Sequence, residues 1–118
     1  MAGINFPFGI MDVPAQPVTT GAAAYTITNA FTYINLAGLT GAVTLNLTLD
    51  GKLLTGSRIF IRVLQGGTGQ NVVLGTGFAS GLLAAVQTLT GVLNNENTIE
   101  CVYDGTSFRP TGAWQRTV

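Results

Sequence analysis

The chain has 118 residues, the length of one domain, and 47% of them are hydrophobic. Only 8% are charged, five Lys+Arg balance five Asp+Glu, and His is absent, whereas soluble domains usually carry about 25% charged residues. This composition excludes a histidine-dependent triad or metal site. It also argues against a nucleic-acid binder, which needs clustered Lys and Arg to neutralise phosphates, and against disorder, which requires low hydropathy.

The first 22 residues predict an extended N-terminal arm, which leads into one domain over 23–118. Apolar residues alternate loosely with small ones in this arm, and three prolines follow them. The apolar residues are Ile4, Phe6, Phe8, Ile10 and Met11. Because these side chains cannot all remain in water, we expect the arm to bind a partner or pack on the domain. Without basic residues and an uninterrupted apolar run, the arm does not predict a signal peptide.

Short segments that alternate apolar and polar residues follow the arm. The clearest is 43–49, where four aliphatic residues alternate with polar ones, which predicts a strand with one buried face. In 57–65 both faces are partly apolar, which indicates a central strand or one that lies against a neighbouring subunit. One face of this segment carries Ile59, Ile61 and Val63, and the other carries Arg58, Phe60, Arg62 and Leu64.

The remaining segments complete an all-β pattern. Further strands are predicted over 25–28, 31–36, 71–74, 98–103 and 107–110, with turns such as Asp50-Gly51 and Asp104-Gly105-Thr106 between segments. The stretch 82–89 fits either a short helix or a loop followed by a short strand, and we favour the second. About seven strands with Gly-rich turns predict a single antiparallel β-sandwich or small barrel, with the extended N-terminal arm.

Few residues suggest chemistry. Cys101 is the single cysteine, and with no basic neighbour in sequence it predicts a buried structural thiol rather than a nucleophile. Glu96, Glu100 and Asp104 recur every four residues, but at strand spacing they span about 26 Å, too far for a paired-carboxylate mechanism or one metal shell. The glycine-rich segment 66–69 completes no phosphate-binding motif. We therefore predict no catalytic residue, no cofactor and no metal site.

Two weaker alternatives remain open. The polar turn 94–97 carries amide and carboxylate oxygens of the kind that bind calcium. Trp114, near the C-terminus, could stack on a sugar ring. The interpretation that we favour for Trp114 is an aromatic residue that closes one end of the fold or contacts a neighbouring subunit.

Several segments form one ordered pattern over about residues 38–112. It comprises Leu39-Thr40-Gly41, Val43-Thr44-Leu45-Asn46-Leu47, Gly56-Ser57-Arg58-Ile59-Phe60-Ile61-Arg62-Val63, Gln65-Gly66-Gly67-Thr68-Gly69-Gln70-Asn71-Val72, Leu89-Thr90-Gly91, Asn94-Asn95, and Cys101-Val102-Tyr103-Asp104-Gly105-Thr106-Ser107-Phe108-Arg109-Pro110. This pattern resembles the small β domain that recurs in virion proteins of tailed bacteriophages, among them capsid decoration proteins, head fibres and tail fibres. The resemblance implies a β fold, often trimeric, without catalytic residues.

The resemblance, the short chain and the apolar arm together predict a structural virion protein. We expect an auxiliary capsid (decoration) or head-fibre protein, a homotrimer whose partner is the major capsid protein or another virion protein. It would be made in the host cytoplasm and located in the virion, with no nucleic-acid or membrane partner, since no apolar run approaches the roughly 18–20 residues of a membrane span. The alternative is a tail-fibre or adhesin module that binds a host-surface glycan.

Overall fold

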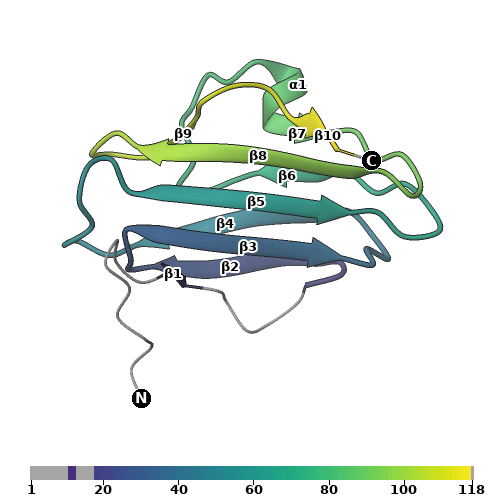
Figure 1. Ribbon diagram of the computed structural model, residues 1–118, viewed down its shortest axis with the longest axis horizontal. Helices are drawn as coiled ribbons and strands as arrows, with labels where there is room; N and C mark the ends of the chain where they lie inside the picture. The colour runs from purple at the N-terminus through teal and green to yellow at the C-terminus, as the bar shows by residue number, and fades with distance from the viewer. Residues whose placement is uncertain (1–10, 13–17, 118) are drawn as a thin grey trace.

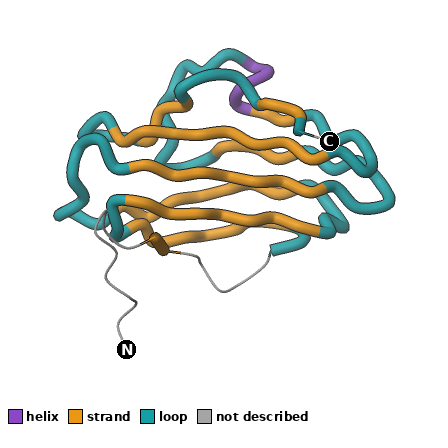
Figure 2. The backbone as a smooth tube through the Cα atoms, in the orientation of Figure 1, coloured by secondary structure: helices purple, strands orange, loops and turns teal. Residues whose placement is uncertain are grey.

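The computed structural model describes residues 11–12 through their backbone and residues 18–117 in full. The predicted arm residues Ile4, Phe6, Phe8 and Ile10, and the side chain of Met11, lie outside the described residues. The elements are β1 Met11–Asp12, β2 Gly21–Ile27, β3 Phe31–Ala37, β4 Val43–Leu49, β5 Arg58–Leu64, β6 Val72–Leu74, α1 Ala84–Gln87, β7 Thr88–Leu89, β8 Glu96–Tyr103, β9 Phe108–Pro110 and β10 Gln115–Arg116. The fold is mostly β, as the sequence predicts (Figure 2).

The strands form two separate sheets that lie one behind the other (Figure 1). The front sheet has the order β1-β3-β5-β8-β10, with β9 also paired to β8. The back sheet has the order β2-β4-β6-β7. Each sheet ends in edge strands, so the two sheets do not close into a barrel. The small barrel, one of the two architectures that the sequence predicts, is therefore not formed.

The predicted antiparallel arrangement is wrong for the first half of the fold. From β1 to β6 the chain alternates between the front and back sheets, and each new strand pairs parallel with the strand two elements earlier. The chain therefore winds as a flattened coil. Antiparallel pairing appears where β7, β8, β9 and β10 join the sheets.

The physical reason is that a strand's alternation fixes its buried face but not its neighbour. The Asp50-Gly51 turn is an example. It forms as predicted, and Asp50 Oδ1 accepts a hydrogen bond from the backbone N–H of Lys52 at 2.8 Å. The loop that follows, however, carries the chain from β4 across to β5 in the other sheet, so no hairpin results.

The core lies between the two sheets and follows the predicted alternation. Ile59, Ile61 and Val63 of β5 are completely buried, and the inward residues of β4 follow the same rule. Strand β5 lies between β3 and β8, which confirms it as a central strand. Full burial of one such side chain stabilises a fold by about 1.5–3 kcal/mol, so these alternate positions set the register of the strands.

Two regions differ from the predicted elements. Residues 82–89 contain the four-residue helix α1 followed by β7, so the helical alternative is right for α1 and the favoured short strand is right for β7. Helix α1 has no buried residue, whereas Leu89 is buried. Sheet structure also extends into the predicted arm, because β2 begins at Gly21 and β1 pairs parallel with the start of β3.

Candidate interaction face

The outer surface of the front sheet gathers aromatic and charged side chains. Strands β3 and β8 flank β5, and the outward residues of all three strands meet there. In β5 the outward positions are the ones that its alternation predicts. We define the interaction face as Phe31, Tyr33, Asn35, Arg58, Phe60, Arg62, Glu96 and Glu100.

Three aromatic rings lie on the interaction face. The register places Tyr33 beside Phe60, and their rings stack with centroids 5.9 Å apart and an interplanar angle of 20°. Phe31 lies one row further along β3 and is 40% exposed. A sheet holds such rings in place, so little freedom remains to be lost when a partner covers them.

Two arginines on the interaction face are each held by a glutamate of β8. Arg58 Nη1 lies 3.2 Å from Glu100 Oε1. Arg62 donates two hydrogen bonds to Glu96 Oε1, from Nη2 at 2.6 Å and from Nε at 3.1 Å. Both pairs run diagonally between β5 and β8, within reach of long side chains on neighbouring strands. The guanidinium group of Arg62 is therefore held more firmly than that of Arg58, whose side chain is 51% exposed.

Glu96 joins the interaction face to the C-terminal residues. Thr117 Oγ1 donates a hydrogen bond to Glu96 Oε2 at 2.7 Å, and this bond, followed by those from Arg62, lowers the pKa of the Glu96 carboxyl below its ordinary value. Arg62 also donates from Nη1 to Asn35 Oδ1 at 2.9 Å. No local sequence pattern marks Asn35 and Thr117 as members of this site, because only strand pairing brings these distant positions together.

The outer surface of the back sheet has a different composition. Its outward positions on β2 and β4 are small or polar and carry no charge: Ala22, Ala24, Thr26, Thr44, Asn46 and Thr48. Asn46 Oδ1 accepts a hydrogen bond from the backbone N–H of Thr76 at 3.0 Å. The aromatic and charged side chains thus distinguish the front surface from the back surface.

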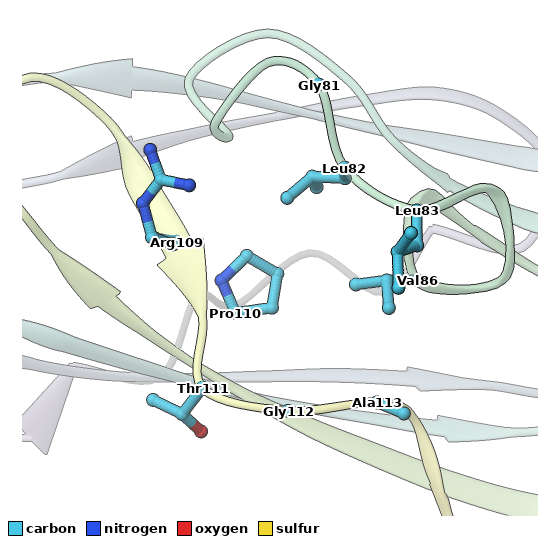
Figure 3. Close-up of a pocket in the computed structure, with 9 residues that line it drawn as sticks. All are labelled: Gly81, Leu82, Leu83, Val86, Arg109, Pro110, Thr111, Gly112 and Ala113. Atoms are coloured by element: carbon cyan, nitrogen blue, oxygen red, sulfur yellow. The ribbon is translucent and has the colours of Figure 1, made fainter.

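A depression of about 390 Å³ lies between the loop that leads into α1 and the chain after β9. Leu82 and Val86 point toward Pro110 across it (Figure 3). Among the described residues that line it, Arg109 is the one charged group, and its Nε lies 3.4 Å from Asp104 Oδ2. This lining suits an apolar group but provides no pair of groups for acid–base chemistry.

Cys101 is completely buried in β8, which confirms the predicted burial of this thiol. Burial, and to a smaller extent the negative charge of Glu100, raises the pKa of the Cys101 thiol to about 12. A thiol in this state is almost entirely protonated at neutral pH, and both its protonation and its burial oppose reaction as a nucleophile.

The three regularly spaced carboxylates have separate partners. Glu96 and Glu100 bind different arginines, and Asp104 lies in the turn after β8. Asp104 Oδ1 accepts hydrogen bonds from the backbone N–H groups of Ser107 and Thr106, both at 2.9 Å, and these bonds lower its pKa. The described residues contain no group of three or more His, Cys, Asp or Glu side chains that could hold a metal ion.

The glycine-rich segment 66–69 packs against another loop of the protein. A Cβ on Gly69 would overlap the carbonyl oxygen of Gly91, and a Cβ on Gly91 would overlap the backbone of Gln70. Gln65 fixes the same segment, because its Oε1 accepts from the Gln70 N–H at 2.8 Å and its Nε2 donates to the Gln70 carbonyl at 2.9 Å. These glycines therefore permit close packing of two loops.

Trp114 closes one end of the fold. Its Nε1 donates a hydrogen bond to the Val86 carbonyl oxygen at 2.9 Å, and its ring packs partly against the core. This arrangement agrees with the interpretation that we favoured for Trp114, and it leaves the interaction face as the main exposed aromatic surface among the described residues.

No protein-family model, curated protein or solved structure matches this chain. The part of the chain that the structure describes has no helix long and apolar enough to span a membrane. The resemblance to phage virion domains therefore stays a prediction.

Proposed function

We propose that the protein is a structural virion protein of a tailed bacteriophage, an auxiliary capsid (decoration) or head-fibre protein that binds the shell, sister subunits or both. The observation that carries the binding role is the interaction face, where stacked Tyr33 and Phe60 lie between Arg58 and Arg62. Aromatic residues and Arg are the residue types most enriched at the centres of protein interfaces.

The ion pairs support binding rather than catalysis. Arg58 and Arg62 already have carboxylate partners, and Arg62 is held by Glu96 and Asn35 together. A partner that covers these groups meets guanidinium and carboxylate groups that already neutralise each other, so fewer unpaired charges need to be desolvated. Burial in an assembly also suits a chain with only 8% charged residues.

The virion setting rests on the sequence resemblance. We infer that the two stacked sheets form a β-sandwich that serves as a rigid module, and that three copies form a homotrimer. The proposed partner beyond the trimer is the major capsid protein or another virion protein. The predicted arm residues Ile4, Phe6, Phe8, Ile10 and Met11 would add contacts to a sister subunit or to the shell. The protein would then be located in the virion after synthesis in the host cytoplasm.

A tail-fibre or adhesin module that binds a host-surface glycan is the second candidate. The rings of the interaction face favour it, since an aromatic ring is a common platform for a sugar; Phe31 is exposed, and Tyr33 and Phe60 are partly exposed. The outer surface of a sheet offers fewer walls to surround a sugar than a cleft does, whereas it suits a broad protein partner. The two candidates therefore assign different ligands to the same surface: a protein partner in the first and a glycan in the second.

Binding to empty phage capsids tests the leading proposal. Co-sedimentation would compare the unaltered protein with Tyr33→Ser/Phe60→Ser, and with Val73→Ser as a control on the back sheet, where Val73 is also partly exposed. We expect the front-sheet variant to lose capsid binding or trimer formation and the control to keep both. Normal assembly by a folded front-sheet variant would overturn the proposal, and binding on a glycan array that depends on the same rings would favour the adhesin.

A further inference from the structure

Strand β2 ends the back sheet with a long edge that pairs with no other strand of the described residues. The other strands that end a sheet, β1, β7, β9 and β10, have two or three residues each, whereas β2 has seven. Edge strands usually avoid further pairing through short length, charged residues or Pro. The sequence of β2, Gly-Ala-Ala-Ala-Tyr-Thr-Ile, has none of these, and no described strand pairs with its outer edge.

The hydrogen bonds show which residues of β2 face that edge. The Gly21 N–H donates to the Ala42 carbonyl at 2.9 Å, and the Ile27 carbonyl accepts from the Asp50 N–H at 3.1 Å, both on the β4 side. Successive residues of a strand direct their backbone groups to opposite sides. Ala22, Ala24 and Thr26 therefore direct their N–H and C=O groups to the outer edge of β2, away from β4.

We propose that the outer edge of β2 is a strand-acceptor site for the segment Ile4–Phe8 of a second copy of this chain. Ile4, Phe6 and Phe8 alternate with the period of a strand. In a parallel pairing they would lie opposite Ala23, Tyr25 and Ile27, which face the core. The added strand would thus place its apolar residues over the same layer of the core.

Pro7 decides the direction of this strand. In the parallel stack, inward residues direct their backbone groups toward the next strand: Val43 donates to the Asn71 carbonyl at 2.9 Å, on the β6 side of β4. A further parallel strand before β2 would follow the same rule. The backbone nitrogen of Pro7, an outward residue that has no N–H to donate, would therefore point away from β2. An antiparallel strand with the same face inward would place Pro7 against β2 and lose a hydrogen bond.

The length of the chain favours a second copy as the donor. If the arm paired with β2 of its own chain, Phe8 would lie opposite Ile27, while Met11 pairs with Phe31 in the front sheet. Only two residues would then cross from the back sheet to the front sheet, whereas the crossing between Ile27 and Phe31 uses residues 28–30. Sheets pack about 10 Å apart, and three fully extended Cα steps reach about 10 Å, so no length remains for a turn. A neighbouring copy has no such restriction.

An exchange of this kind joins two different surfaces, the donor segment and the acceptor edge. Such head-to-tail contacts form a closed ring when the rotation between subunits closes. Three members would match the proposed trimer, but the exchange itself does not depend on the virion setting. Loss of capsid binding and loss of strand exchange would therefore be seen in separate experiments.

Disulfide trapping tests the inference. Asn5→Cys and Ala24→Cys would face each other on the outward side of the paired strands, at a separation that a disulfide can span. The two single variants would be co-expressed, so that every Asn5→Cys chain can meet an Ala24→Cys chain, and then oxidised. Asn5→Cys with Thr98→Cys, on the outer surface of the front sheet, is the matched control. The native Cys101 is buried and should not interfere.

We expect a covalent heterodimer from Asn5→Cys with Ala24→Cys and little from the control pair. A yield equal to the control would overturn the proposal. A third result would also overturn it: an Asn5→Cys/Ala24→Cys double variant whose disulfide closes only within one chain, seen as a monomer on a non-reducing gel, would show that the chain supplies its own strand.

Discussion

Arg62 and Glu96 are joined across β5 and β8 by two hydrogen bonds to a single carboxylate oxygen, at 2.6 Å and 3.1 Å. Both side chains are largely covered, with 27% and 20% of their surface exposed. Thr117 binds the other oxygen of the same carboxylate. This carboxylate therefore connects the interaction face to the C-terminal residues, and its ionisation affects both.

Acid should destabilise the protein partly through Glu96. The folded state lowers the pKa of Glu96 from its ordinary value of 4.5. Its ionised form therefore contributes stability that is present above that value and is lost as the pH falls through the folded-state pKa. Glu96→Gln should lower Tm at neutral pH and flatten its decline between about pH 5 and 3.

Thermal unfolding followed by circular dichroism over this pH range would measure the effect. Some decline should remain in the variant, because the folded state also lowers the pKa of Asp104. If the Tm of Glu96→Gln declined with falling pH as steeply as that of the unaltered protein, the role that we give to this carboxylate would be contradicted.

Cys101 should not react with a thiol reagent in the folded protein. The thiol is completely buried and its pKa is raised to about 12, so both access and ionisation oppose the reaction. Ellman's reagent at pH 8 should therefore titrate no thiol in the native protein and one thiol per chain in guanidinium chloride. Rapid reaction under native conditions would show that β8 opens readily.

The local character of each strand could be predicted from the sequence, but the pairing of strands could not. In β5, alternation correctly separates buried Ile61 from outward Arg62, because burial is decided residue by residue along the strand. The parallel pairing of β3 with β5 depends on loops that cross between the sheets, and no local pattern encodes which strand pairs with which. Turn signals between short strands therefore predict an antiparallel fold even where the strands pair parallel.

The candidate site shows the same division. Arg58, Phe60 and Arg62 could be placed on one surface from their spacing alone. Their partners Glu100 and Tyr33 could not, because each lies on another strand and meets them only through the register. Asp104 was partly predictable, since Asp-Gly-Thr is a turn signal whose Asp side chain bonds to the backbone of the turn.

Adjacent alanines of β2 should respond in opposite ways to proline. The N–H of Ala23 faces β4 and its side chain is buried, so Ala23→Pro removes a hydrogen bond of the sheet and should destabilise the fold by about 1–3 kcal/mol. Ala24 is exposed and its N–H faces the outer edge of β2, so Ala24→Pro should leave the free energy of unfolding nearly unchanged.

Ala24→Pro should nevertheless weaken association if the edge accepts a strand. Urea unfolding would measure stability, and light scattering would measure the molar mass of the assembly. Equal destabilisation by both substitutions would contradict the assignment of alternate N–H groups to the two sides of β2.

Gly77 should tolerate no side chain. Its φ is +89°, and a Cβ would lie 2.6 Å from the Cβ of Leu47, a buried core residue. A non-glycine residue in this backbone region costs about 1–2 kcal/mol before any clash is counted. Gly77→Ala should therefore lower Tm by several degrees, whereas Gly112→Ala, which meets nothing within 4 Å and has no positive φ, should leave it unchanged or raise it slightly. Differential scanning calorimetry of the two variants gives the comparison, and equal Tm values would show that the loop at Gly77 shifts to make room.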